Sequence, residues 1–268
     1  MAISAKDVKD LRQTTGMGMM ECKKALTETD GDVQKAIELL REWAGGKMDT
    51  READAGEGAL AIAQSGNGIA IVKIVTETDF AARNEDFLAK AQQVAEDVAS
   101  QSTTGAVTPG PDAGKVIEDL RITIKEKIAY GGGTRLAGPK VASYVHSDRK
   151  SGAILAAEGD FSDELLRGLC MHITAAVPPV CPAPLALDEA GLSDADKDEA
   201  LARFTQEAKD TGKPEEIATK IAQGKMKKWI SDSTLLGQIY IKEMDAKKPI
   251  SHYIPAGGKI LAFERMGV

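Results

Sequence analysis

The chain has 268 residues and a formal net charge of −7 at pH 7; 43% of its residues are hydrophobic and 28% are charged. This length exceeds the usual size of one domain, so it predicts two or more folding units. The acidic balance argues against non-specific nucleic-acid binding, which needs clustered lysine and arginine. No apolar run approaches the roughly 20 residues that span a bilayer, and the first residues lack a signal-peptide pattern, so we expect a cytoplasmic protein.

The first 46 residues are expected to form a compact bundle of three short helices. Ser4 followed by Asp7 resembles a capping box that begins the first helix. Glycines break that helix and leave Met19 and Met20 on a turn before the second one. Asp32 then caps a third helix. The inward face of this third helix is expected to be Val33, Ala36, Ile37 and Leu40.

An α+β pattern begins after an aperiodic linker, around which the bundle is expected to move. Two strand-like runs, 59–63 and 69–75, flank Gly66-Asn67-Gly68, a sequence typical of hairpins. An acidic corner follows, and Asn84 or Asp86 then caps a helix. The inward face of that helix is expected to be Phe87, Leu88, Ala91, Val94, Ala95 and Val98.

The second half of the chain repeats this order of elements. Strand-like runs at 143–146 and 153–157 precede Glu158-Gly159-Asp160-Phe161, which matches Glu77-Thr78-Asp79-Phe80 in its position between strand and helix. We expect Asp79 and Asp160 to share a structural role, such as capping the helix that follows. The predicted fold class is therefore α+β, with a helical bundle followed by two related subdomains.

An insertion interrupts the second subdomain. Helical spacing on both sides of Gly212 and Pro214 predicts an antiparallel pair of helices, whose apolar stripe is too thin for a core. The pair either projects into solvent or packs on a second copy of the chain. The expected boundaries are 1–46 for the bundle, 47–57 for the linker, 58–140 for the first subdomain, 141–183 with 227–268 for the second, and 184–226 for the inserted hairpin.

Residue types that support catalysis are scattered along the chain. None of His146, His172 and His252 lies in a metal-binding pattern, and His172 takes the place of Val94 in the repeat, as a core histidine would. The three cysteines are expected to be buried thiols, and none has an obvious histidine partner in the sequence. Gly131-Gly132-Gly133-Thr134 lacks the phosphate-loop pattern and is interpreted as a flexible turn. We therefore expect no active site, metal or cofactor.

Phe80 is unusual because it is an aromatic residue at a polar strand-to-helix corner. Its sequence context is compatible with two orientations: inward, as the last core residue of the strand, or outward, as an anchor for another protein. Met19 and Met20 carry the same ambiguity, since flexible thioethers suit both a core and an interface.

Several long segments resemble the elongation factor Ts family of bacteria. The most specific are VKDLRQTTGMGMMECKKALTETDGDVQKAIELLRE at 8–42 and TETDFAARNEDF at 76–87, followed by SYVH at 143–146, GKPEEIATKIAQGKMKKW at 212–229 and LLGQIYI at 235–241. Two regions depart from the family. Residues 127–131 differ from its Lys-Ile-Gly-Glu-Asn type, and the sequence ends soon after Arg265, where some relatives carry a further helix.

The resemblance implies that the chain stimulates GDP release from elongation factor Tu so that GTP can replace it. The bundle is similar to a ubiquitin-associated domain. The resemblance implies no direct binding of nucleotide, nucleic acid or membrane by the chain itself. Three sets of residues carry over by position: Thr78, Asp79, Phe80 and Ala81 toward the partner's magnesium site, Arg12, Met19 and Met20 toward its GTPase domain, and His146 toward its third domain.

Two other classes of function compete with exchange. One is a pure interaction module, in which a ubiquitin-associated-type bundle is tethered to an assembly scaffold; such a scaffold needs no aromatic residue at position 80. The other is a small-molecule enzyme that uses Asp79 and Asp160 together in one pocket. The repeat argues against it, because it places the two aspartates on separate subdomains.

Overall fold

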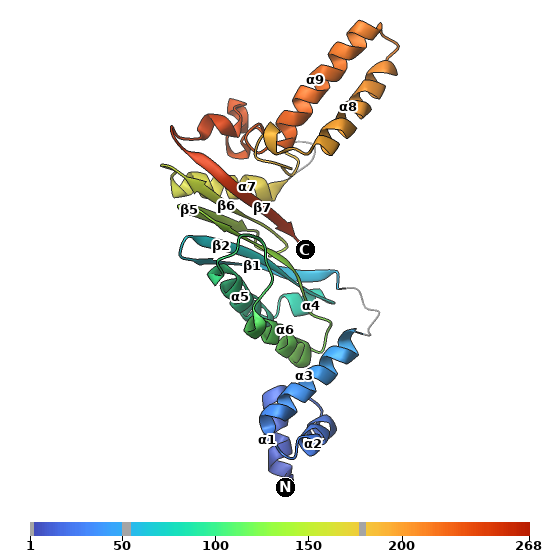
Figure 1. The fold of residues 1–268 in the computed structure, drawn as a ribbon, viewed down its shortest axis with the longest axis vertical. Helices are drawn as coiled ribbons and strands as arrows, with labels where there is room; N and C mark the ends of the chain where they lie inside the picture. The colour runs from blue at the N-terminus through green and yellow to red at the C-terminus, as the bar shows by residue number, and fades with distance from the viewer. Residues whose placement is uncertain (1–2, 50–54, 177–180) are drawn as a thin grey trace. The chain divides into compact units, whose positions relative to one another are not determined.

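The computed structural model describes residues 3–49, 55–176 and 181–268, which fall into two compact units (Figure 1). The first unit comprises Met1–Arg135, Val145–Ser151 and Met266–Val268, and the second comprises Leu136–Tyr144 and Gly152–Arg265. Both units contain helices and strands, and three helices precede the first strand. The predicted α+β class is thus confirmed.

Three helices, α1 (Ala5–Thr15), α2 (Met19–Glu28) and α3 (Val33–Asp49), form the N-terminal bundle. The predicted capping box begins α1: Asp7 N donates to Ser4 Oγ over 3.2 Å, and Ser4 N donates to Asp7 Oδ2 over 3.0 Å. These bonds lower the pKa of the Asp7 carboxyl, because they favour its charged form. Local sequence alone therefore determines where the first helix starts.

Two details of the predicted bundle are wrong. Val33 is exposed, because as the first residue of α3 it precedes the turn that faces the core, whereas Ala36 and Leu40 are buried. Met19 is the first residue of α2 rather than part of a turn, since Gly18 occupies the N-cap and its backbone N donates to Glu21 Oε2 over 3.1 Å.

The bundle continues past its predicted end and contacts another helix of the first unit. Helix α3 runs to Asp49, and residues 50–54 of the expected linker lie outside the described residues. Arg41 Nε donates to Asp119 Oδ1 over 2.7 Å, and Ile122 joins the hydrophobic core of the bundle. Movement of the bundle about the linker stays a prediction.

A four-stranded sheet lies at the centre of the first unit, in the order β1 (Glu57–Ser65), β2 (Gly68–Thr76), β4 (Ala129–Ala137) and β3 (Gly105–Ala106). β1 and β2 form the predicted antiparallel hairpin, in which Ser65 pairs with Gly68. Helices α5 (Glu85–Ser100) and α6 (Pro111–Ile124) share one hydrophobic core with the sheet (Figure 1). Asn84 caps α5, since its Oδ1 accepts from Asp86 N and Phe87 N.

The glycine-rich segment predicted as a flexible turn lies inside strand β4. An added Cβ would approach Val75 Cγ1 to 2.9 Å at Gly131 and Tyr130 Oη to 2.1 Å at Gly133. Larger residues would clash at both positions, so glycine is needed for close packing within the sheet. The prediction failed because the neighbour at Gly131, Val75, comes from strand β2 and leaves no mark on the segment's own composition.

The second unit repeats the strand-strand-helix order and adds the helical hairpin. Its three-stranded sheet has the order β5 (Lys140–Val145), β6 (Ser151–Glu158) and β7 (Lys259–Gly267), and α7 (Asp163–Ala175) contributes to the core beside it. The hairpin consists of α8 (Asp194–Lys209) and α9 (Glu215–Ser233). Short 3-10 turns at Glu189–Gly191, Ile241–Ala246 and Ile250–Tyr253 complete the unit. Residues 177–180 of the proline-rich segment lie outside the described residues.

No helix within the described ranges combines the length and the apolar character that a membrane crossing requires.

Candidate functional site

The corner after β2 presents Phe80 on a single turn of helix, α4 (Asp79–Ala82). Thr78 caps this turn, because its Oγ1 accepts from Ala81 N over 3.2 Å. Ala81 and Ala82 are buried, and α4 packs on β1 and β2. With the alanine side of the turn against the sheet, Phe80 points away from it and is 84% exposed. Of the two orientations that the sequence allows, the structure shows the outward one.

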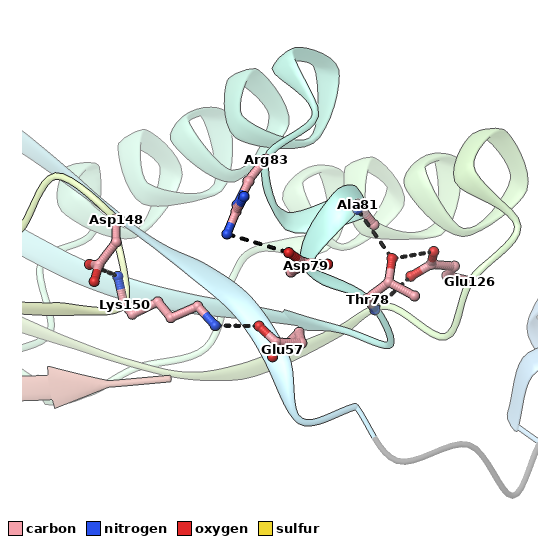
Figure 2. Close-up of polar contacts among 8 residues, drawn as sticks. All are labelled: Glu57, Thr78, Asp79, Ala81, Arg83, Glu126, Asp148 and Lys150. Atoms are coloured by element: carbon pink, nitrogen blue, oxygen red, sulfur yellow. Dashed lines mark hydrogen bonds and ion pairs between the residues drawn. The ribbon is translucent and has the colours of Figure 1, made fainter.

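A carboxylate from a distant segment holds the base of the corner. Glu126 Oε1 accepts from Thr78 Oγ1 over 2.7 Å, and Glu126 Oε2 accepts from Thr78 N over 3.1 Å (Figure 2). Glu126 Oε2 also accepts from Thr76 Oγ1 over 2.9 Å. Sequence reasoning missed Glu126, which lies 48 residues from Thr78 along the chain.

Asp79 does not cap a helix, which contradicts the role predicted for the paired aspartates. It lies in the first turn of α4, and its Oδ2 is 3.3 Å from Arg83 Nη2 (Figure 2). Both side chains are substantially exposed, so this pair contributes less than about 1 kcal/mol to stability. In the second repeat Ser162, not Asp160, caps α7 through a bond from Leu165 N. The helix that corresponds to α7 in the first copy is α5, and its cap is Asn84 rather than an aspartate.

The equivalent corner of the second unit places its aromatic residue in the opposite environment. Phe161 is 1% exposed and belongs to the hydrophobic core of that unit. Gly159, at the position of Thr78 in the repeat, adopts a φ of +102°, which redirects the chain in a way that threonine resists. The exposure of Phe80 is therefore a property of its own corner rather than of the repeated motif.

The residues predicted to dock on a GTPase domain lie on the bundle. Met19 is 52% exposed and Met20 is 75% exposed at the start of α2, while nearby Met17 is buried. Arg12 is exposed in the last turn of α1, which Gly16 caps. Met19 and Met20 thus face solvent rather than a core, and thioethers of this kind adapt to the shape of a partner.

His146 directly follows strand β5 and lies at one end of an ordered turn. Its backbone N donates to Ser151 O over 2.8 Å, and Arg149 N donates to His146 O over 2.9 Å. The exposed imidazole Nδ1 is 3.3 Å from Asp148 Oδ1. A hydrogen bond from Lys150 N, and the nearby histidine, lower the pKa of the Asp148 carboxyl.

A buried cysteine and histidine meet in the second unit, a pairing that was not obvious from the sequence. Cys181 Sγ lies 3.5 Å from His172 Nε2. His172 Nδ1 accepts from Ile241 N over 3.2 Å, so Nε2 carries the proton of the neutral ring and donates to Gln238 Oε1 over 2.8 Å. The ring has no free acceptor for the thiol proton, and burial raises the pKa of Cys181. The pair is therefore structural, as predicted for His172.

The stability of the second unit should fall in mild acid because of His172. Burial lowers the pKa of His172 below its ordinary value of 6.5. Below pH 6.5 the imidazole of His172 is protonated in the unfolded chain. In the folded protein it stays neutral until the pH falls to its lower, folded-state pKa. The contribution of His172 to stability is therefore fully present above pH 6.5. As the pH falls from 6.5 toward the lower pKa of the folded state, the free energy of unfolding should decline by at most about 1.4 kcal/mol per pH unit.

Urea unfolding at pH 7.5 and pH 5.5 measures this effect. The comparison is between the parent chain, His172→Gln and His252→Gln, the last removing an exposed histidine. Loss of the pH difference is expected only in His172→Gln, and an unchanged difference in that variant would contradict the prediction.

No group of three or more histidine, cysteine, aspartate or glutamate side chains in the described part of the chain is arranged to hold a metal ion. All three cysteines, Cys22, Cys170 and Cys181, are free and buried, as predicted, and burial raises the pKa of Cys170 to about 12. The candidate site is therefore the set of exposed side chains described above: Phe80 with its corner, Arg12, Met19, Met20 and His146.

Comparison with known proteins points to one family. A sequence model described as Elongation factor TS matches residues 77–268. Elongation factor Ts of Alkalilimnicola ehrlichii is 36% identical over 286 residues, covering 100% of this chain and 92% of the relative. The proteins of the same name are 37% identical in Xanthomonas campestris pv. campestris, with the same coverage, and 34% identical in Christiangramia forsetii, covering 99% of this chain and 98% of the relative.

These matches place the chain among the translation elongation factors of bacteria. Within that class it belongs to the elongation factor Ts family.

Proposed function

We propose that the chain is a guanine-nucleotide exchange factor that binds elongation factor Tu with GDP and promotes GDP release. The observation that carries the proposal is Phe80, an aromatic side chain that is 84% exposed on a hydrogen-bonded corner within the segment matched by the family. Exposing so large an apolar group costs solvation and is typical of an interface anchor. A scaffold that only tethers a bundle has no use for it.

In this proposal the corner residues Thr78, Asp79, Phe80 and Ala81 act together on the magnesium and phosphate site of elongation factor Tu. Phe80 inserts as an apolar wedge, and Mg²⁺ coordination and phosphate contacts are lost because a packed site rearranges in discrete steps. The bundle docks on the GTPase domain through Arg12, Met19 and Met20. His146 contacts the third domain.

Exchange of this kind breaks no covalent bond and needs no cofactor in the factor itself, so we propose that the chain is not an enzyme in the chemical sense. It must bind the nucleotide-free partner more tightly than the GDP-bound partner. By reciprocity, the chain and GDP weaken each other's binding by the same factor. We place this reaction in the cytoplasm, where translation takes place.

Stopped-flow release of a fluorescent GDP analogue from elongation factor Tu tests the proposal, first with millimolar Mg²⁺ and then with the metal chelated. Faster release in the presence of the chain is expected. The acceleration should be much smaller without Mg²⁺, because the contact that the chain disrupts is then already lost. Binding without acceleration at millimolar Mg²⁺ would support the scaffold instead, and equal acceleration in both buffers would contradict an action through the metal site.

A further inference from the structure

We propose that Glu126 is a positioning residue for Phe80, whose carboxylate fixes the corner so that the aromatic ring enters the partner at one angle. This inference rests on the proposed exchange function and adds to it a residue from outside the corner segment. Glu126 lies in the segment between α6 and β4, and it is partly buried.

The hydrogen bonds at Glu126 suit a carboxylate better than any neutral side chain. Three donors converge on it, namely Thr76 Oγ1, Thr78 N and Thr78 Oγ1 (Figure 2 shows the two from Thr78). An ionised carboxylate only accepts, so all three bonds form at once. Bonds to a charged acceptor are also about twice as strong as neutral ones.

A second carboxylate links the corner to the segment before β4. Here the corner supplies the carboxylate, and the segment supplies the donor. Glu77 Oε1 accepts from Lys127 N over 2.7 Å. Two adjacent residues of the corner, Glu77 and Thr78, are therefore bonded to two adjacent residues of the segment before β4. Paired links of this kind resist rotation of the corner as well as its displacement.

The corner needs this support because α4 cannot hold itself. A helix of four residues lacks the cooperative bonds that stabilise longer helices. The exposed pair of Asp79 and Arg83 adds little. Phe80 itself is 84% exposed, so its ring contributes no packing that would anchor the backbone. The bonds to Glu126 therefore fix the residue that precedes Asp79, together with the bond from Lys127 N to Glu77 and the buried alanines beneath α4.

The second corner supports this reasoning by contrast. There the buried ring of Phe161 anchors the turn by its own packing. An aromatic side chain presented to solvent loses that anchor, and a hydrogen-bonded brace takes its place.

The test measures GDP release from elongation factor Tu over a range of concentrations of the full chain, for Glu126→Ala, Glu126→Gln and Glu118→Gln. Glu118 is an exposed glutamate of α6 whose side chain makes no hydrogen bond or ion pair within the described residues, so its variant controls for charge. We expect Glu126→Ala to lower the maximal rate about tenfold, as for the loss of a charge-assisted bond. The concentration at half-maximal rate should change less than about twofold, because docking by the bundle is intact.

Partial rescue is expected in Glu126→Gln, since the amide oxygen still accepts from Thr78 N while the amide nitrogen donates to Thr78 Oγ1. Glu118→Gln should behave as the parent chain. A role that is only structural would instead lower the melting temperature and affect docking and rate together.

A double-mutant cycle with Phe80→Ala decides whether Glu126 acts through the ring. If it does, Glu126→Ala has no further effect on the maximal rate once Phe80 is truncated. Equal effects in the two backgrounds would overturn the inference, as would a parental maximal rate for Glu126→Ala while Phe80→Ala remains slow. In both cases the exchange function would stand. No acceleration by the parent chain would overturn both proposals.

Discussion

Phe80→Ala is expected to slow the maximal rate of chain-stimulated GDP release about 30-fold, which corresponds to about 2 kcal/mol of lost interaction. The reason is geometric. Phe80 is the only residue of α4 with a large side chain directed away from the sheet, since Ala81 and Ala82 are buried beneath it. Truncating the ring leaves a polar corner that has nothing to insert into a packed magnesium site.

The folded state should be insensitive to the same change. Because Phe80 is exposed and outside the hydrophobic cores, the free energy of unfolding of Phe80→Ala should stay within about 0.5 kcal/mol of the parent value. Leu201→Ala, which truncates an exposed leucine of α8, is the matched control and should exchange normally. If Phe80→Ala accelerates GDP release as well as the parent chain, exchange would survive as a function but the wedge would lie elsewhere.

The features that the sequence predicted correctly are those determined by neighbouring residues. The capping box of Ser4 and Asp7, the hairpin at Gly66-Asn67 and the cap at Asn84 all form within a few positions of the chain. Side-chain bonds to local backbone groups depend on spacing, and spacing can be read directly. The α+β class followed because the repeated order of strands and helices is local as well.

The features that sequence reasoning missed depend on contacts between distant residues. Glu126 and Thr78 are 48 positions apart, and nothing in either segment marks them as partners. The same holds for Gly131 and Gly133 of β4, whose need for close packing arises from Val75 and Val72 of β2. For Phe80, composition left both orientations open; only the resemblance to a family favoured the outward one before the structure showed it.

Phe161→Ala is the reciprocal prediction, with a large effect on stability. Phe161 is 1% exposed in the core of the second unit, and an added Cβ at Gly258 would lie 2.8 Å from its Cε2. Removing the ring leaves a cavity in tightly packed surroundings, so the free energy of unfolding of that unit should fall by about 3–5 kcal/mol. Urea unfolding followed by the emission of Trp229, in a Trp43→Phe background, reports on the second unit because Trp229 lies in α9.

Phe161→Leu serves as the milder control and should lose less, since leucine fills part of the cavity. The two aromatic residues thus divide two roles between copies of one motif: Phe161 stabilises and Phe80 is available for binding. Stability should respond to position 161 and not to position 80. A loss of similar size in Phe80→Ala would mean that its ring packs in solution, which would remove the basis for treating that corner as an interface anchor.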